Sequence, residues 1–402
     1  MKHRYFFLLV VAALPVMAQE SLSLLSQEKQ SVLQLQKEIY ESEYEKLRTN
    51  WIAPLNLTGS YSYDKSTQGD ERSETKRVSG SISQDIFRSG GITYQIAYAD
   101  AKKEREALSW LKEAAGYNQQ LFTALLDFRK SLYQKEQSVL RLKNKEIEIF
   151  IKRQLFEAGK ADITELNNAL MEKSSELKTL ASLEYTIAFQ RYEIAKTSDV
   201  DPGSVELPRF ELMERNEYLQ RQFDLLYAQA NTQTLRHLYD VTTAGYLPSV
   251  ALNAALGYQN YDPIDNPGGF GGHYYSAGVS VSLPLAYNAS ATIQEAKATY
   301  LKQAASAADI SRETAASYAQ SVEKINSYRE TISITSRNLA LYNDLIGAIK
   351  AGVDAGTKTG YDLQTLQNSK MIEEFDIKIN EINIQTELAK LHFSLKPSKD
   401  TQ

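Results

Sequence analysis

Side chains capable of catalysis or metal binding are present in this sequence, but they do not have the spacing of a site. The four histidines, none with a partner at metal-ligand spacing, are His3, His237, His273 and His392. The acidic pair Glu373-Glu374 lies in a predicted helix, where a solvated face explains it. GGFGG at 268–272 precedes a strand rather than a helix, which predicts a flexible loop and not a phosphate-binding turn. The chain has no cysteine, so thiolate chemistry is excluded, and we expect no enzyme activity, cofactor or metal site.

Two short stretches of the chain nearly repeat each other. EAGKADITEL, from Glu157 to Leu166, and DAGTKTGYDL, from Asp354 to Leu363, align without a gap at an offset of 197 positions. Gly159 and Gly356 each end one long helical pattern and precede another, which predicts the turns of two helical hairpins. An ordinary helical turn explains one such stretch. Two with the same residues at the same spacing indicate a repeated architecture.

The N-terminal segment has the pattern of a secretory signal. A basic start precedes an apolar run from Tyr5 to Ala18, with small residues before a cleavage position. We expect residues 1–18 to be a signal peptide and the mature chain to begin near Gln19; the alternative is a buried N-terminal helix. No other stretch reaches the ~18 apolar residues of a spanning helix, and the net charge of −5 gives no reason to expect nucleic acid as a partner.

Helix breakers divide the chain into unusually long helical segments. No proline occurs from 55 to 201 or from 285 to 396, and these regions are rich in Ala, Leu, Glu, Lys and Gln. Segments 92–157 and 288–353 each predict a helix on the order of 100 Å long. The helix after the first turn has a heptad stripe, which predicts packing along one face with the rest in water. The stripe consists of Ile163, Leu166, Leu170, Leu177, Leu180, Ile187 and Ile194, interrupted by Lys173, Glu184 and Arg191.

Four segments between the helices alternate apolar and polar residues, as strands with two different faces do. The polar face is almost purely Ser, Thr, Asn and Gly, and the apolar face extends to Ile86 in the second segment and Leu285 in the fourth. A soluble sheet packed on the helices and a membrane sheet with its apolar face toward lipid both fit. Lengths near the ~9–11 residues of a tilted spanning strand, and aromatic residues at both ends, favour the membrane sheet. The aromatic residues are Trp51, Phe87, Tyr246 and Tyr287 at one end and Tyr61, Tyr63, Tyr258, Tyr261, Tyr274 and Tyr275 at the other.

These patterns give two halves of the same order: helix, strand, loop, strand, very long helix, turn, helix. The first half, 19–200, has strands near 54–64 and 76–87, the long helix 92–157, the turn 158–163 and a helix over 163–197. A linker at 201–209 leads to the second half, 210–396, with strands near 248–261 and 273–286, the long helix 288–353, the turn 354–361 and a helix over 362–394. Four strands cannot close a barrel, and open edges do not persist in lipid. Two copies would give 8 strands, and three would give 12 with room for a channel, which a water-facing polar face favours.

With these features the chain resembles the outer membrane efflux proteins, the exit ducts of tripartite efflux and type I secretion systems. The resemblance rests on the two halves, on the prolines that introduce the first strand of each (Pro54 and Pro248), and on the AG-x-x-x-x-x-[DE]-L turns at 158–166 and 355–363. It implies an α+β membrane protein: a homotrimer whose 12-stranded outer-membrane β-barrel continues as a long α-helical periplasmic barrel. The partners it implies are a periplasmic adaptor protein, an inner-membrane transporter and outer-membrane lipid.

The resemblance also implies roles for residues of the turns. In a gate at the periplasmic end, Lys358 ties to Glu165, and Asp362, threefold repeated, lines the constriction. We expect the adaptor to dock at the turns, since loop tips on a rigid scaffold commonly carry function; alternatively, the two glycines merely end their helices. The docking residues would be Gly159, Lys160, Asp162, Gly356 and Thr357. A structural or adhesive coiled-coil envelope protein without a pore is the other function class, and the two-faced strands argue against it.

Overall fold

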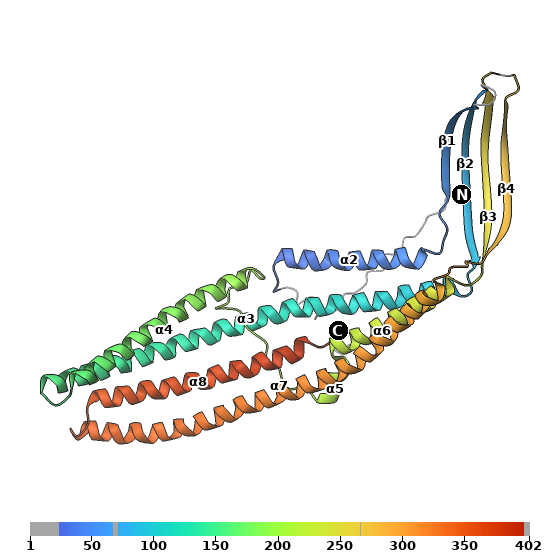
Figure 1. Cartoon of the computed structure of the whole chain (residues 1–402). Coiled ribbons are helices and arrows are strands. Elements are labelled where there is room, and N and C mark those ends of the chain that lie inside the picture. The colour runs from blue at the N-terminus through green and yellow to red at the C-terminus, as the bar shows by residue number, and fades with distance from the viewer. Residues whose placement is uncertain (1–23, 67–70, 266, 398–402) are drawn as a thin grey trace, which may run out of the picture. The chain divides into compact units, whose positions relative to one another are not determined.

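The computed structural model describes residues 24–66, 71–265 and 267–397 (Figure 1). The chain divides into two compact units. Within the described residues, the helical unit comprises 24–34, 110–224 and 311–397, and the sheet unit comprises 35–109 and 225–310. The expected signal peptide at 1–18 and the expected start near Gln19 lie outside the described residues.

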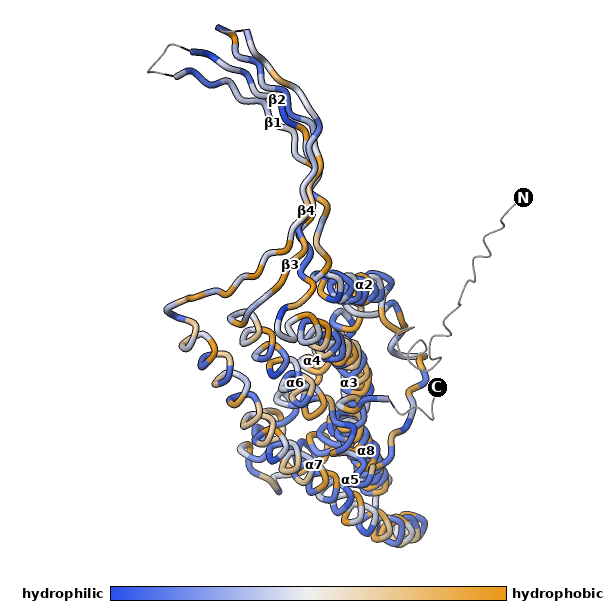
Figure 2. Tube along the Cα trace, turned by 90° about the vertical axis from the view of Figure 1, so that its right-hand side faces the viewer, coloured by the Kyte–Doolittle hydropathy of each residue, from blue (hydrophilic) through white to orange (hydrophobic). Residues whose placement is uncertain are grey.

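Two antiparallel hairpins of long helices dominate the fold. In the first, α3 (Gly91–Glu157) turns into α4 (Ile163–Ala195), and in the second, α7 (Ala289–Asp354) turns into α8 (Gly360–Phe393). Figure 1 shows the two helices of each hairpin side by side. Hydrophobic and hydrophilic residues are interleaved along them in Figure 2, as expected of helices that each bury one stripe. In the part of the chain that the structure describes, no helix combines the length and the apolar character that crossing a membrane requires.

Three small cores hold the helical unit together. The first joins the start of α2 (Gln27–Thr49) to α3 and α4 around Leu33, Leu125 and Phe128. The second joins α5 (Arg215–Arg221) to α7 and α8. The third joins α3 to α8, where the ring of Phe210 lies 5.1 Å from that of Phe122 and 5.5 Å from that of Phe393. The two hairpins therefore share buried apolar surface rather than standing apart.

The predicted apolar stripe of α4 is only half buried within one chain. Leu180 and Ile187 are half buried and Ile194 is buried, but Leu170 and Leu177 keep 46% and 45% of their surface exposed. The face of α4 that packs on α3 is centred on the fully buried Ala169 rather than on its neighbour Leu170. Part of the predicted stripe thus packs within the hairpin, while the row that begins at Ile163 stays exposed within one chain.

The three charged residues of the stripe make contacts with α3 while Glu184 and Arg191 remain exposed. Lys173 pairs with Glu146 at 2.9 Å, and Glu184 pairs with Lys135 at 2.9 Å. The guanidinium of Arg191 lies over the ring of Phe128, 5.7 Å from its centroid. Each side chain thus spans from α4 to α3, where long polar side chains can cover apolar surface and keep their charge hydrated.

The sheet unit contains four antiparallel strands in the order β1-β2-β3-β4, which lie side by side in Figure 1. They are β1 (Asn56–Lys65), β2 (Arg72–Phe87), β3 (Ser249–Pro263) and β4 (Phe270–Ser282). The helix α6 (Phe223–Ala244) precedes β3. A chain that combines four antiparallel strands with long helices confirms the predicted α+β fold.

The ends of two strands differ from the sequence prediction for identifiable reasons. β2 begins at Arg72 rather than near 76, because Arg72 pairs with Lys65 in the ladder and its guanidinium binds the carboxylate of Asp265 at 2.6 Å. β4 ends at Ser282 rather than near 286, because Pro284 has no N–H to continue the ladder. The register also shifts between Asp85 and Phe87, which removes Ile86 from the regular alternation.

Candidate functional sites at the hairpin turns and on the sheet

The two hairpin turns have the same backbone geometry. Gly159 and Gly356 have φ values of 68° and 70°, in the left-handed region that glycine adopts without strain. In each turn the glycine N–H donates to the carbonyl three residues back and the next N–H donates to the carbonyl five residues back, at 2.8–3.0 Å. This is the Schellman pattern of a helix C-terminus. A Cβ at either glycine would meet nothing within 4 Å, so the backbone angle alone requires glycine.

The helix after each turn begins with a side-chain cap at the matching position. In the first turn, Asp162 accepts a hydrogen bond from the N–H of Thr164 at 3.1 Å. In the second turn, Thr359 forms a capping box with Asp362: the N–H of Asp362 donates to Thr359 Oγ1 at 3.2 Å, and the N–H of Thr359 donates to Asp362 Oδ2 at 3.0 Å. The proposed gate acid Asp362 is therefore also the residue that starts α8.

Hydrogen bonding stabilises the charged form of Asp362. The bond from the Thr359 backbone, together with that from the Thr359 hydroxyl, lowers the pKa of Asp362, and the charge of Lys358 adds to this. Asp362 is thus ionised at neutral pH and aimed at its own helix terminus. Sequence reasoning missed this role, although the T-x-x-D spacing of a capping box was visible.

The structure brings the three predicted gate residues near the turns without linking all of them. Lys358 lies on the second turn, where its side-chain stem covers Gly352: a Cβ there would come within 2.7 Å of Lys358 Cγ. Glu165 is exposed at the start of α4. Among the described residues, no ion pair joins Lys358 to Glu165 within one chain, so the proposed tie remains a prediction.

The two hairpins also contact each other close to their turns. The ring of Phe150 on α3 lies 5.1 Å from that of Tyr361 on α8. Further along, the side-chain amide of Asn368 donates to Asn144 Oδ1 at 2.8 Å, and that of Gln137 donates to the carbonyl of Ile372 at 2.9 Å. The α3–α8 contact near the turns thus combines aromatic and polar contacts.

The register of the sheet assigns every strand residue to one of two faces. Leu57, Val78, Leu256 and Val279 lie on an apolar face that also carries Tyr61, Tyr63, Tyr258 and Tyr275 near the loops. The opposite face carries the serines, threonines and asparagines, for example Ser83, whose hydroxyl donates to Asn253 Oδ1 at 2.6 Å. The sheet therefore has the two-faced character that the alternation predicts.

Two of the tyrosines expected at the lipid-facing rim are on the polar face instead. Tyr261 pairs with Thr75 and Phe270, and Tyr274 pairs with Gly257, all of which belong to the polar face. The prediction considered how far along the strand each aromatic residue lies, which fixes its depth. Its face depends on whether its position is odd or even, because side chains alternate strictly along a strand.

Among the described residues, no group of three His, Asp or Glu side chains is placed to hold a metal ion. His392 stacks on Phe210 with ring centroids 4.4 Å apart, and burial lowers the pKa of its imidazole. His392 therefore packs against an aromatic ring at the surface of the helical unit.

Solved outer-membrane channels have the same fold. The chain matches the Vibrio cholerae outer membrane protein VceC with a TM-score of 0.73 at 15% identity, covering 94% of this chain and 94% of that one. It matches the outer-membrane channel OprN with a TM-score of 0.72 at 17% identity, covering 93% and 89%. The Campylobacter jejuni outer membrane channel CmeC matches with a TM-score of 0.71 at 12% identity, covering 96% and 87%. A comparison with curated proteins gave no match.

A sequence comparison matches part of the chain to a family. The family model for outer membrane efflux proteins matches residues 215–374, from the start of α5 into α8. The predicted resemblance to the outer membrane efflux proteins is confirmed. The match includes the second hairpin turn and the strands β3 and β4. Outer membrane efflux proteins form a family of channels rather than of enzymes.

Proposed function

We propose that this protein is the passive outer-membrane exit duct of a tripartite efflux or type I secretion system. Substrates would reach it from an inner-membrane transporter through a periplasmic adaptor protein and leave through its lumen. The observation that carries the proposal is the sheet with one apolar and one Ser-rich face, directly continuous in the chain with α3 and α7. A duct needs no catalytic group, so the proposal assigns it no enzyme activity and no cofactor.

The duct would be a homotrimer with a 12-stranded barrel. The edge strands of the sheet, β1 and β4, have unpaired backbone groups along their outer sides, and such edges need partners in lipid. A neighbouring copy could pair with each edge, and three copies leave a water-filled interior behind the Ser-rich face. The exposed row of α4, which includes Leu170, Leu177 and Tyr192, offers each neighbour an apolar surface.

The orientation follows from the ends of the sheet. The helices adjoin the strands at one end, and the loops within 64–75 and 262–272 join them at the other. Long loops of outer-membrane barrels face outward, so these loops would lie outside the cell and the helical unit in the periplasm. An epitope inserted in either loop should label on intact cells. Labelling only after permeabilisation would reverse this orientation.

Single-channel conductance in planar bilayers tests the duct directly. The purified protein should come from the outer-membrane fraction, run as a trimer and conduct ions in steps of uniform size. A chain that fractionates with the envelope but never conducts would instead favour the alternative function, a structural or adhesive coiled-coil protein without a pore. A soluble periplasmic monomer would overturn both the membrane placement and the trimer.

The adaptor would dock at the two turns around Gly159 and Gly356, which present exposed residues on rigid hairpins. Lys160, Asp162 and Thr357 would make the contacts. The test is cross-linking to the adaptor in cells that carry Lys160→Ala, Asp162→Asn or Thr357→Val, of which Asp162→Asn keeps an oxygen that can cap α4. Full cross-linking and full export in all three would place docking elsewhere.

Glu165, Lys358 and Asp362 would form the periplasmic gate. One exposed ion pair contributes only about 0–1 kcal/mol, but three copies would shift the closed-to-open ratio roughly tenfold to a hundredfold at 1.4 kcal/mol per decade. Lys358→Ala or Glu165→Gln should raise the open fraction, and exchanging the two charges should restore the closed state. Wild-type conductance in all of these variants would remove these residues from the gate.

A further inference from the structure

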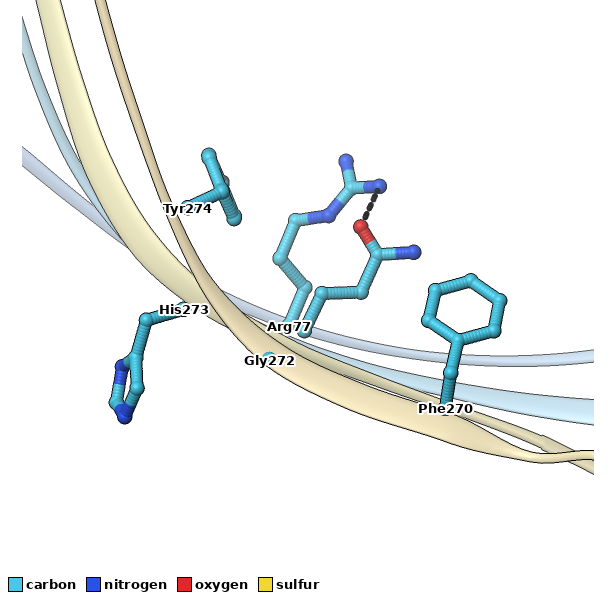
Figure 3. A pocket seen from close by; sticks show the side chains of 6 residues that line it. Arg77, Phe270, Gly272, His273 and Tyr274 are labelled. Atoms are coloured by element: carbon cyan, nitrogen blue, oxygen red, sulfur yellow. Dashed lines mark hydrogen bonds between the residues drawn. The ribbon is translucent and has the colours of Figure 1, made fainter.

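The polar face of the sheet contains one recess that a neutral channel wall does not require. Its volume is about 430 Å³, and its lining residues are Arg77, Gln259, Phe270, Gly272, His273 and Tyr274. Figure 3 shows Arg77, Phe270 and Tyr274 projecting from the same side of the strands, while His273 points to the other side. The recess therefore joins a cation and aromatic rings on a face that elsewhere carries mostly small neutral side chains.

Three successive rungs of the sheet build the recess. The central rung consists of Arg77, Gln259 and Gly272, and Gly272 leaves open space, since a Cβ there would meet nothing within 4 Å. The rung on the loop side carries Tyr261 and Phe270, with ring centroids 5.4 Å apart. Same-face rungs are ~6.7 Å apart along a strand, so aromatic groups flank the guanidinium on both sides.

Glycine makes room for the aromatic ring on the other side of the central rung. Tyr274 pairs with Gly257, and a Cβ on Gly257 would come within 2.9 Å of Tyr274 Cζ. The ring therefore lies across the glycine, on the surface of the sheet. Any larger residue at 257 would push the ring away from the recess.

Arg77 is held in place but keeps hydrogen-bonding capacity. One of its terminal nitrogens donates to Gln259 Oε1 at 2.8 Å, which leaves other N–H groups of the fork for a ligand. Within the described strands, Arg77 is the only charged residue on the polar face between Asp64 and Asp85. A cation among neutral hydroxyls and amides is an electrostatic site for an anion.

We propose that Arg77, Tyr274 and Phe270 form a binding site for aromatic anions, meaning compounds in which a carboxylate or sulfonate is attached to a ring. A guanidinium binds such an oxyanion through two parallel hydrogen bonds, and the rings on the adjacent rungs can stack on the aromatic part of the ligand. The site rests on the proposed function, because it places these groups on the wall of the duct. It adds a selective contact there for aromatic anions.

The test uses naphthalene-2-sulfonate as the probe and the full-length protein in detergent, titrated by the fluorescence of the probe. Arg77→Gln should weaken binding about tenfold or more, since it removes the charge and the bidentate donor. Tyr274→Leu should weaken the binding of naphthalene-2-sulfonate. It should leave competition by methanesulfonate unchanged, because methanesulfonate has no ring. Lys76→Gln is the matched control: Lys76 adjoins Arg77 but lies on the apolar face, paired with Glu74 at 3.3 Å.

Bilayer measurements separate this site from the duct itself. If the wild type conducts, Arg77→Gln should reduce the chloride-to-potassium permeability ratio more at 0.1 M than at 1 M salt, because the Debye length falls from ~10 to ~3 Å. Naphthalene-2-sulfonate binding that is equal in the wild type and in Arg77→Gln would overturn the site, whether or not the protein conducts. Arg77-dependent binding by a protein that never conducts would keep the site and reject the duct.

Discussion

The two hairpins of the helical unit close with the same turn but are held together along their lengths by different interactions. Between α3 and α4 the ion pairs are partly exposed, and they join Lys145 to Glu172, Lys173 to Glu146 and Lys135 to Glu184. In the second hairpin the carboxylate of Glu387 on α8 is buried. It accepts hydrogen bonds from Lys324 on α7 at 2.6 Å and from Lys390 of its own helix at 3.0 Å. The glycines thus fix the geometry of both turns, whereas the contact between the two helices, here called the seam, uses different polar interactions in each hairpin.

This difference should affect stability more than any other contrast between the hairpins. Breaking an exposed ion pair costs little free energy, because water replaces the lost partner. A buried carboxylate is already desolvated, so its hydrogen bonds to charged donors are worth more. We therefore expect the second hairpin to depend on one residue and the first to distribute its polar stabilisation over several.

The largest effect is expected from Glu387→Ala. Only 6% of the surface of Glu387 is exposed, so the substitution removes two charge-assisted hydrogen bonds and leaves a small cavity. We expect a loss of about 2 kcal/mol, measured as a lower melting temperature and faster hydrogen exchange in α8. Glu172→Ala, in the exposed seam of the first hairpin, is the matched control and should cost less than about 1 kcal/mol. Equal losses would show that burial does not distinguish the seams.

The same carboxylate should make the second hairpin sensitive to acid. Burial raises the pKa of Glu387, but the hydrogen bonds from Lys324 and Lys390 outweigh it, so the pKa lies below its ordinary value. A lowered pKa in the folded state contributes stability above the unfolded pKa of about 4.3, and this stability is lost as the pH falls through the folded value. The melting temperatures of wild type and Glu387→Gln should therefore differ at pH 7 and converge toward pH 3. A constant difference would assign the effect to packing.

Sequence patterns predicted the parts of this fold that depend on local conformation. The glycines at 159 and 356 predicted left-handed turns, and both have positive φ. The alternation around Val78 and Leu256 predicted two-faced strands, and the register confirms them. Such features depend on one residue or on one period, which a single sequence displays directly.

Features that depend on which elements are neighbours could not be predicted. The sequence shows that α4 is amphipathic, but not that Ala169 rather than Leu170 would face α3. It likewise gives no reason to separate Glu387 from the solvated acids of other helices. Arg77 was detectable in principle as a lone charge within a Ser-lined strand, but its aromatic neighbours come from β4, and only the register brings them together.

The shared turn geometry predicts equal effects at the two glycines. Gly159→Ala and Gly356→Ala should each cost about 1 kcal/mol, because alanine at positive φ is strained while no neighbouring atom obstructs the new methyl group. Gly347→Ala is a control of opposite sign: it lies inside α7 with open space around it and should stabilise by roughly 0.5–1 kcal/mol. Melting temperatures of the three variants measure this. A large cost at only one turn would mean that partner contacts, not backbone strain, fix that glycine.

The smallest expected difference concerns the acids at matched positions, Asp362 and Glu165. Asp362→Ala removes half of a capping box and should lower the stability by about 0.5–1 kcal/mol. Glu165 forms no such box, so Glu165→Ala should change the stability by close to nothing. Local hydrogen exchange at the start of α8 and of α4 would measure this difference.

The comparison of these two acids also separates two explanations for any conductance change in Asp362→Asn. Thr359→Ala breaks the cap from the other side and keeps the carboxylate charge. If a ring of charges acts at the constriction, the cation preference of the conductance should weaken in Asp362→Asn but not in Thr359→Ala. A conductance change of the same size in both variants would mean that Asp362 acts by holding the first turn of α8, and the gate would then depend on helix capping rather than on a ring of charges.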